Sequence, residues 1–234
     1  MSSNYVGQEL DTFAHARNWK KYWSCEIGPY LAGDILEVGA GLGANTEFLL
    51  TDRIESWVSL EPDPGLAARM RTLLAEQPAL SKCVVKVGTT ATIDPESKFD
   101  GILYIDVLEH IEDDSAELAR ASKLLKKGGK IIVLAPAHQW LYTPFDRAIG
   151  HFRRYDRQSL SACKPPQCAL RKICYLDSAG VLASAGNRLF LKQADPVLRQ
   201  ILFWDRFLVP MSRVLDPLTF YAIGKSVLAI WERQ

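Results

Sequence analysis

Short apolar runs alternate with longer segments of helical periodicity along most of the 234-residue chain. The runs are too short for helices, and glycine or charged residues bound several of them, as is typical of buried strands. Seven runs are predicted strands: residues 34–38, 56–61, 83–87, 99–106, 130–135, 170–176 and 226–231. The alternation of strand and helix through residue 135 predicts a doubly wound α/β domain with a mostly parallel sheet.

Apolar stripes at spacings of three and four mark the predicted helices. Residues 8–31 form one helix, whose stripe is Ala16, Trp19, Trp23, Ile27 and Tyr30. A second helix begins after residue 61, where Asp63 is a good cap and Pro64 suits the first helical position. Its predicted buried stripe is Leu66, Met70, Leu73 and Leu74.

Two further helical regions follow the fourth and sixth runs. The acids Glu112, Asp113 and Asp114 open a helix that Lys126 and Lys127 close, an order of charges that suits the helix dipole. Leu118, Ala121, Leu124 and Leu125 face inward, and Gly128-Gly129 are expected to stop the helix. After the sixth run, Asp195-Pro196 is a predicted helix start, and Pro210 and Pro217 are expected to break the following apolar region into short pieces.

Composition places the chain among ordinary globular proteins of a single domain. It is 48% hydrophobic and 24% charged, and its net charge of +1 gives no long-range attraction to nucleic acid. No run of 18 uncharged apolar residues is present, and the start MSSNYVGQELD has no secretory pattern. The five cysteines are odd in number and scattered, so we expect free thiols in the cytoplasm.

The stretch DILEVGAGLGA, residues 34–44, is the strongest functional signal. A buried strand runs into Gly39, Gly41 and Gly43, which allow a tight turn and a close approach of ligand and helix to the backbone. The same pattern fits a dinucleotide site, because an acid, Glu61, ends the second strand about twenty positions on. Glu37, however, would repel a pyrophosphate and would attract an ammonium group.

With Glu37 and Glu61, this loop resembles the class I S-adenosylmethionine (SAM) methyltransferases, and the motifs DVLEHI and KKGGKIIV extend the resemblance. The resemblance implies a Rossmann-like seven-stranded sheet in which the last strand is antiparallel and lies between strands five and six. It also implies SAM as cofactor. The implied cofactor-binding residues are Glu37, Gly39, Ala40, Gly41, Gly43, Glu61, Pro62, Gly88, Thr89, Asp106 and Val107. Gly88-Thr89-Thr90 departs from the family, where an acid often follows the glycine.

Residues 136–157, PAHQWLYTPFDRAIGHFRRYDR, have the highest density of aromatic, histidine and arginine side chains. They follow the fifth strand, at the edge where open α/β sheets place ligands, so we expect a substrate-facing loop. The candidate general bases are His110, His138 and His151. The candidate substrate-binding residues are Tyr142, Arg153, Arg154 and Tyr155. The alternative for the arginines is structural pairing with Asp146 or Asp156.

Asp106, Glu109 and His110, with His138 or His151, could form a metal site of oxygen and nitrogen ligands. Similar motifs occur in metal-free members of the family that the chain resembles, and we expect no metal.

We therefore predict methyl transfer from SAM, by direct displacement, to an oxygen of a small or lipid- or sugar-linked acceptor. The alternatives are a nicotinamide-dependent oxidoreductase and a non-catalytic binding protein. The domain is expected to comprise a helical lid (residues 1–33), a SAM-binding core (34–135) and an acceptor side (136–234). The apolar region after the sixth strand could cap the site, form a dimer face or lie on a membrane, in that order. A monomer or homodimer is expected.

Overall fold

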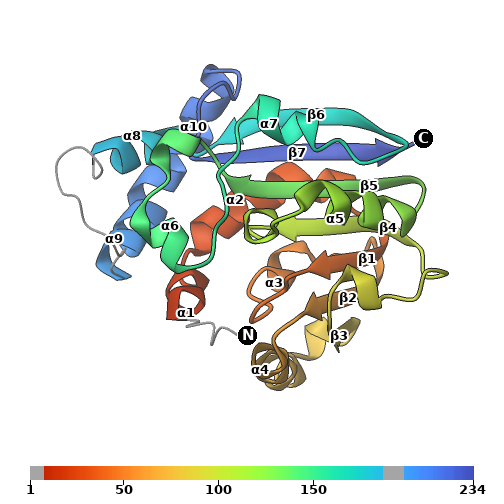
Figure 1. Ribbon diagram of the computed structural model, residues 1–234. Coiled ribbons are helices and arrows are strands. Elements are labelled where there is room, and N and C mark those ends of the chain that lie inside the picture. Colours follow the sequence, from red (N-terminus) through yellow and green to blue (C-terminus); the bar gives the residue numbers. More distant parts are fainter. Residues whose placement is uncertain (1–7, 187–197) are drawn as a thin grey trace.

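The computed structural model describes residues 8–186 and 198–234 and has a three-layer α/β architecture (Figure 1). Its strands are β1 (Gly33–Val38), β2 (Ile54–Glu61), β3 (Cys83–Val87), β4 (Phe99–Ile105), β5 (Leu125–Pro136), β6 (Cys168–Leu176) and β7 (Ser226–Arg233). They form one sheet in the order β3-β2-β1-β4-β5-β7-β6. β7 pairs antiparallel with both β5 and β6, while the pairs among β1 to β5 are parallel. The predicted sheet, including the place of its last strand, is confirmed.

Helices cover both faces of the sheet. The helices are α1 (Gln8–Ala14), α2 (Arg17–Ile27), α3 (Thr46–Leu49), α4 (Pro64–Ala75), α5 (Asp114–Lys123), α6 (Pro144–Ala148), α7 (Arg157–Ala162), α8 (Ser178–Gly186), α9 (Leu198–Phe203) and α10 (Val209–Leu218). Leu118 of α5 and Leu160 of α7 pack in the core on one face, and Trp23 of α2 and Val209 of α10 pack on the other. Figure 1 shows α1, α6, α8 and α9 gathered beyond one end of the sheet.

The predicted helix over residues 8–31 is wrong in two respects, because it is divided and because its second part, α2, ends at Ile27 before a 3-10 turn (Gly28–Tyr30). Ala16 leaves the helical region (ψ 65°) between α1 and α2. The Nζ atom of Lys20 donates to the carbonyl of Phe13 (2.7 Å), which satisfies an acceptor at the end of α1. Ala16, Trp19, Trp23 and Ile27 are all buried, as the spacing predicted.

One predicted helix end and one predicted stripe also differ. α5 ends at Lys123, because Leu125 pairs with Phe99 and already belongs to β5. Gly128-Gly129 therefore lie within an irregular stretch of β5 rather than at the end of a helix. On α4, Asp63 caps the helix as predicted, but Leu73 is exposed and the helix packs through Ala67 and Met70.

Pro210 and Pro217 do not break the region after β6, contrary to the prediction. Residues 198–218 form one continuous helix, in which a π-turn (Trp204–Leu208) joins α9 to α10. The amide of Val209 donates to the carbonyl of Trp204, five residues back, so the bonding pattern has already shifted before Pro210, which lacks an amide hydrogen. The predicted start at Asp195-Pro196 lies outside the described residues. Among these residues, no helix has both the length and the apolar composition needed to cross a bilayer.

Candidate functional site

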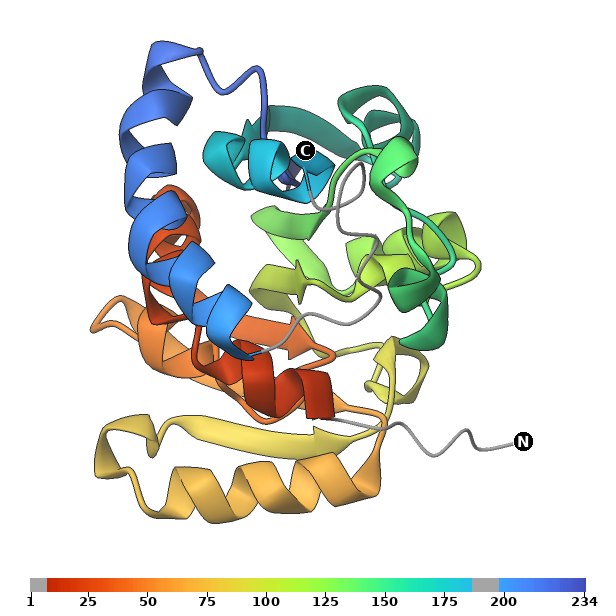
Figure 2. The same cartoon turned by 90° about the vertical axis from the view of Figure 1, so that its left-hand side faces the viewer.

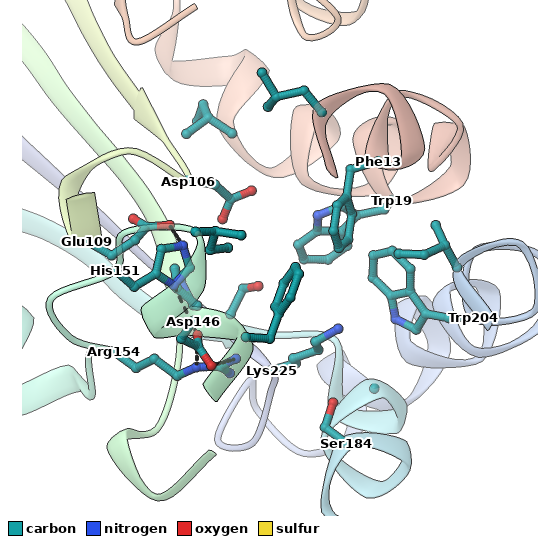
Figure 3. A pocket seen from close by; sticks show the side chains of 18 of the residues that line it. Phe13, Trp19, Asp106, Glu109, Asp146, His151, Arg154, Ser184, Trp204 and Lys225 are labelled. Atoms are coloured by element: carbon teal, nitrogen blue, oxygen red, sulfur yellow. Dashed lines mark hydrogen bonds and ion pairs between the residues drawn. The ribbon is translucent and has the colours of Figure 1, made fainter. Parts of the chain in front are cut away.

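A cavity of about 1280 Å³ lies at the end of the sheet where the parallel strands finish (Figure 3). Five described parts of the chain line it: the glycine loop after β1, the segment after β4, the loop after β5, helices from the two ends of the chain, and the start of β7 with the residue before it. Aromatic side chains such as Trp19, Phe145 and Trp204 share the wall with acids, histidine and lysine. The cavity therefore combines an apolar wall with several groups that can hold or move protons.

The glycine loop presents bare backbone to this cavity. Gly39 and Gly41 line it, and both have positive φ angles (66° and 56°) that favour glycine. A Cβ atom on Gly39 would lie 2.6 Å from Val107, and one on Gly41 would approach Leu10 of α1 at 3.5 Å. The loop thus needs glycine for its shape and leaves open the space beside its backbone.

Two predicted acids support the loop from behind. Glu61 accepts hydrogen bonds from the amides of Gly41 (2.8 Å) and Asp63 (2.9 Å), and it is 5% exposed. Glu37 is 1% exposed and accepts from the side chains of Thr46 and Trp57 (3.1 and 3.2 Å). Burial raises the pKa of Glu37 to about 7. Neither acid lines the cavity, so their direct contact with a cofactor stays a prediction.

The other predicted cofactor residues divide into two groups. Ala40 and Asp106 line the cavity. The described residues that line it do not include the other five, which are Gly43, Pro62, Gly88, Thr89 and Val107. The amide of Gly88 donates to the carbonyl of Glu61 (3.0 Å), so these two predicted residues are neighbours at the ends of β2 and β3.

Asp106 follows β4 directly in a strained conformation, with a φ of 53°. It is exposed, and Figure 3 shows its side chain in the cavity. Burial raises the pKa of Asp106 to about 6, against the opposing charges of His151 and Lys20. Lys20 lines the same wall, and burial lowers its pKa to about 8 although Asp106 acts in the other direction.

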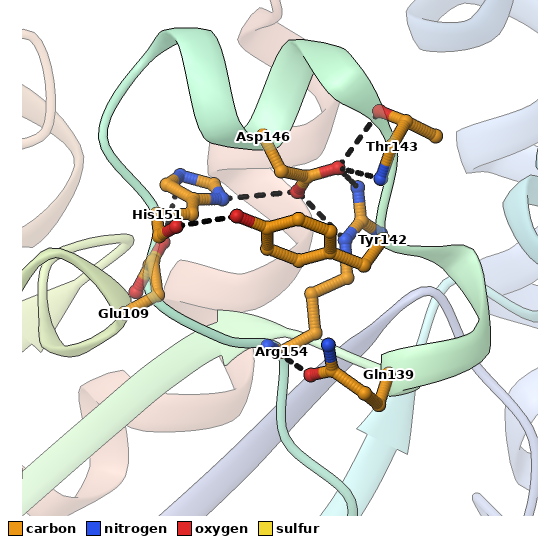
Figure 4. Close-up of polar contacts among 7 residues, drawn as sticks. All are labelled: Glu109, Gln139, Tyr142, Thr143, Asp146, His151 and Arg154. Atoms are coloured by element: carbon orange, nitrogen blue, oxygen red, sulfur yellow. Dashed lines mark hydrogen bonds and ion pairs between the residues drawn. The ribbon is translucent and has the colours of Figure 1, made fainter.

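His151 is held by a network of polar groups around the buried Asp146 (Figure 4). Its Nδ1 lies 3.0 Å from Oδ1 of Asp146, which also receives Nε of Arg154 at 2.7 Å. The other oxygen of Asp146 accepts from the amide and hydroxyl of Thr143, both at 2.8 Å. Burial raises the pKa of Asp146, but the hydrogen bonds from His151 and Arg154 outweigh it and hold this pKa well below its usual value. Asp146 is therefore a fixed anion beside His151.

The carboxyl group of Glu109 completes this side of the cavity. Its oxygens are buried and have no hydrogen-bond partner among the described residues, and Oε1 lies 3.8 Å from Nε2 of His151. Burial raises the pKa of Glu109 well above its usual value, and the charge of Asp106 adds to this effect. The ring of His110 meets that of His151 edge to face at 4.5 Å, and burial lowers the pKa of His110 to about 4.

Glu109, His110 and His151 offer ligand atoms that lie within 4.8 Å of one another. The chemistry of this set would suit a divalent transition metal, and His151 has the carboxylate partner that metal-binding histidines often have. This grouping matches part of the alternative metal site from the sequence. The expected absence of a metal stays a prediction.

Four other predicted residues differ in their placement. Tyr142 and Arg154 line the cavity, and the hydroxyl of Tyr142 donates to the carbonyl of His151 (2.6 Å). Arg153 instead pairs with Asp114 (2.6 Å), and the buried hydroxyl of Tyr155 donates to the same oxygen (2.7 Å). Neither lines the cavity, and the structural alternative for Arg153 has Asp114 as its partner rather than Asp146 or Asp156.

His138 also lies outside the lining. Its Nε2 is 3.0 Å from the carbonyl of Gly224, and its ring packs on Tyr175. Of the three candidate bases, the structure thus brings His110 and His151 to the cavity.

Lys225 is the main residue that the sequence reasoning missed. Its Nζ lies 4.7 Å from the centre of the Trp204 ring, which is fixed by a hydrogen bond from its Nε1 to Asp177 (2.7 Å). No described residue accepts a hydrogen bond from this ammonium group, and burial lowers the pKa of Lys225 against the opposing charge of Asp177. A single lysine before a final strand carries no signal in the sequence. Asp146 was considered only as a partner for an arginine.

Comparison with known proteins shows which proteins the chain is similar to. Residues 36–131 match the model of a methyltransferase domain. A ubiquinone biosynthesis O-methyltransferase of Rhodopseudomonas palustris (strain BisB18) is 36% identical over 52 residues, 22% of this chain and 20% of that protein. One from Bradyrhizobium sp. (strain ORS 278) is 30% identical over 109 residues, 45% of this chain and 41% of that protein. The chain thus matches less than half the length of these curated relatives.

The fold extends the similarity over the whole chain. The structure of a geranyl diphosphate methyltransferase in complex with SAM superposes with a TM-score of 0.66 and 11% identity, covering 100% of this chain and 93% of that one. Residues 36–131 are therefore similar to a methyltransferase domain, and the chain has the Rossmann-like fold of this solved methyltransferase.

Proposed function

We propose that this protein transfers a methyl group from SAM to an oxygen atom of a small acceptor that has a polar end and an apolar body. The observation that carries the proposal is a single cavity lined by both the glycine loop and the His151–Asp146 pair. Cofactor and acceptor would then meet without crossing bulk water. The two similar ubiquinone biosynthesis proteins are O-methyltransferases by name, which favours oxygen as the acceptor atom.

The residues around the glycine loop fit SAM. Bare backbone at Gly39 and Gly41 leaves room for an extended ligand, and Asp106 offers a carboxylate for its ammonium group. Bound there, SAM would supply an electrophilic methyl group. Glu61 and Glu37 would act through the loop that they support, and Glu61 could also accept the ribose hydroxyls.

On the acceptor side, His151 is the best placed general base. If Nδ1 donates to Asp146, Nε2 keeps its lone pair and can accept the proton of an acceptor hydroxyl. The anionic Asp146, held by Arg154, would stabilise the imidazolium that forms. Trp19, Phe145 and Trp204 would exclude water and contact the apolar body of the acceptor.

Lys225 gives the acceptor site a second polar end. An ammonium group that has no hydrogen-bond acceptor among the described residues and lies over an aromatic ring is suited to a carboxylate or phosphate. We therefore include an anionic or strongly polar substituent in the acceptor class.

Labelled-methyl transfer tests the proposal directly. Purified protein with methyl-labelled SAM is offered phenols that carry an apolar tail, each with and without a carboxylate, and calorimetry compares SAM with NAD. We expect SAM to bind, NAD not to bind, and label to enter a phenolic oxygen. Binding of NAD in place of SAM would contradict the proposal. SAM binding without transfer to any acceptor would favour a non-catalytic protein.

Metal removal tests the expectation of metal-free chemistry. Dialysis against a chelator should leave the transfer rate unchanged, because a His–Asp pair can accept the proton without a Lewis acid. Loss of the rate, restored by a divalent ion, would instead make Glu109, His110 and His151 metal ligands.

A further inference from the structure

The helix over residues 198–218 exposes an unusual amount of apolar surface. Sixteen large hydrophobic residues of the described chain are exposed, and nine of them lie between Leu198 and Ile223. Five form a line at spacings of four, four, three and four, which we call the outer stripe: Phe203, Phe207, Met211, Val214 and Leu218. Their exposed fractions run from 44% to 70%. Figure 2 shows this helix along one side of the molecule, beside α1 and α2.

A second line on the same helix is buried. The inner stripe, Ile201, Asp205, Val209, Ser212 and Asp216, repeats the same spacings two residues earlier and is at most 6% exposed. Asp205 accepts from the amide of Trp19 (2.8 Å), and Asp216 accepts from the hydroxyl of Tyr22 (2.7 Å). The inner stripe therefore already fixes the helix to α2, and the fold does not need the outer stripe for packing.

Charge on the exposed side of this helix has one sign. Asp205 and Asp216 are the only acids between residues 198 and 225, and both are buried. Arg199, Arg206 and Arg213 recur every seven residues and are exposed. The guanidinium of Arg206 lies 5.6 Å from the ring centre of Phe207, so a cation borders the outer stripe. The surface is thus apolar and cationic, although the whole chain carries a net charge of only +1.

We propose that the outer stripe and its arginines dock this protein on the surface of an anionic lipid bilayer. Apolar side chains on one face of a helix with flanking arginines are what an interfacial helix requires, because the side chains enter the acyl boundary and the arginines bind lipid phosphates. A second copy of the chain would fit this surface less well than a bilayer. It would bring the arginines of two helices together, and this segment offers no exposed acid to pair with them.

The cavity opens beside this docking surface. Arg199 and Phe203 line the cavity, and Phe203 is also the first residue of the outer stripe. A bilayer against the helix would therefore lie at the mouth of the cavity. Together with the proposed function, on which this step rests, the arrangement indicates that the acceptor is lipid-linked and enters from the membrane.

Sedimentation with vesicles tests the docking surface on the whole protein. We expect binding to phosphatidylglycerol vesicles, weakening with salt, and little binding to phosphatidylcholine vesicles. Arg206→Gln with Arg213→Gln should lower the partition coefficient about 30-fold at low salt. Phe207→Ser with Val214→Ser should lower it at least about tenfold. None of these four side chains lines the cavity.

Matched controls carry the same changes elsewhere. Val84→Ser with Leu170→Ser removes exposed apolar side chains from β3 and β6, and Lys123→Gln with Lys127→Gln removes exposed cations; both should leave binding unchanged. Equal losses in the controls, or no binding by the unchanged protein, would overturn the proposal. So would a dimer in solution that the Phe207 and Val214 changes dissociate without any vesicle binding.

SAM affinity measured on the same samples separates the two proposals: SAM binding without vesicle binding removes only the docking surface, and vesicle binding without SAM binding removes only the proposed function.

Discussion

Arg153 and Arg154 are adjacent in the chain but belong to different networks. Arg154 lines the cavity and holds Asp146 through two hydrogen bonds (2.7 and 3.0 Å), whereas Arg153 pairs with Asp114 away from it. Arg154→Ala should lower the transfer rate about 10- to 100-fold, because general-base catalysis by His151 depends on an anchored Asp146. Arg153→Ala is the matched control and should lower the melting temperature while the rate per folded molecule is unchanged. Equal rate losses in both variants would mean that the two networks are not separate.

Because of Glu37, the free energy of unfolding should depend on pH. Burial raises the pKa of Glu37 from 4.5 to about 7, and hydrogen bonds from Thr46 and Trp57 offset only part of this. Below pH 4.5 both folded and unfolded chains hold the proton. Between pH 4.5 and 7 the unfolded chain releases it first, so the free energy of unfolding should fall by up to about 3 kcal/mol and then level off.

Urea unfolding of the protein and of Glu37→Gln across this pH range measures that effect. The difference between the free energies of unfolding of the two proteins should grow from pH 4.5 to 7, since the other titrating groups are common to both. Curves that stay parallel would show that Glu37 ionises in the folded chain as easily as in the unfolded one.

Among the elements, Tyr155 holds the loop between β5 and α7 in place. Its hydroxyl donates to Asp114 (2.7 Å) at the start of α5, and its amide donates to the carbonyl of Pro136 at the end of β5. Tyr155→Phe leaves a carboxylate oxygen with one donor fewer and should cost about 1.5–3 kcal/mol of stability. The transfer rate at low temperature should hold, because Tyr155 does not line the cavity. A rise in KM for the acceptor without loss of stability would support the substrate-binding role predicted from the sequence.

Elements whose signals are local could be predicted from the sequence. The glycine loop, the cap at Asp63 and the buried stripe of α2 follow from backbone conformation and periodicity, and they are present. The continuous helix through Pro210 could not be predicted, because its π-turn is stabilised by packing on α2. The partners of Arg153 and His151, and the position of Lys225, depend on contacts between distant segments, which no local pattern encodes.

At the scale of the whole molecule, cofactor binding should stabilise the fold. SAM at one hundred times its dissociation constant contributes about 2.7 kcal/mol to the free energy of unfolding. For a chain of 234 residues this raises the melting temperature by about 5–10 °C. Thermal unfolding with SAM, with NAD and without either ligand measures the effect, and NAD should give no shift. Stabilisation by NAD alone would contradict the assigned cofactor.

The position of β7 in the sheet has a consequence for synthesis on the ribosome. In the part of the chain that the structure describes, β5 and β6 do not pair with each other, and β7 (Ser226–Arg233) lies between them and pairs with both. Until residue 233 has left the exit tunnel, the nascent chain therefore presents two open strand edges, one of them on the apolar β5. Such edges are sites of aggregation in partly folded chains. Completion of the sheet must then follow translation of its last strand, and any chaperone that assists this protein would act in that interval.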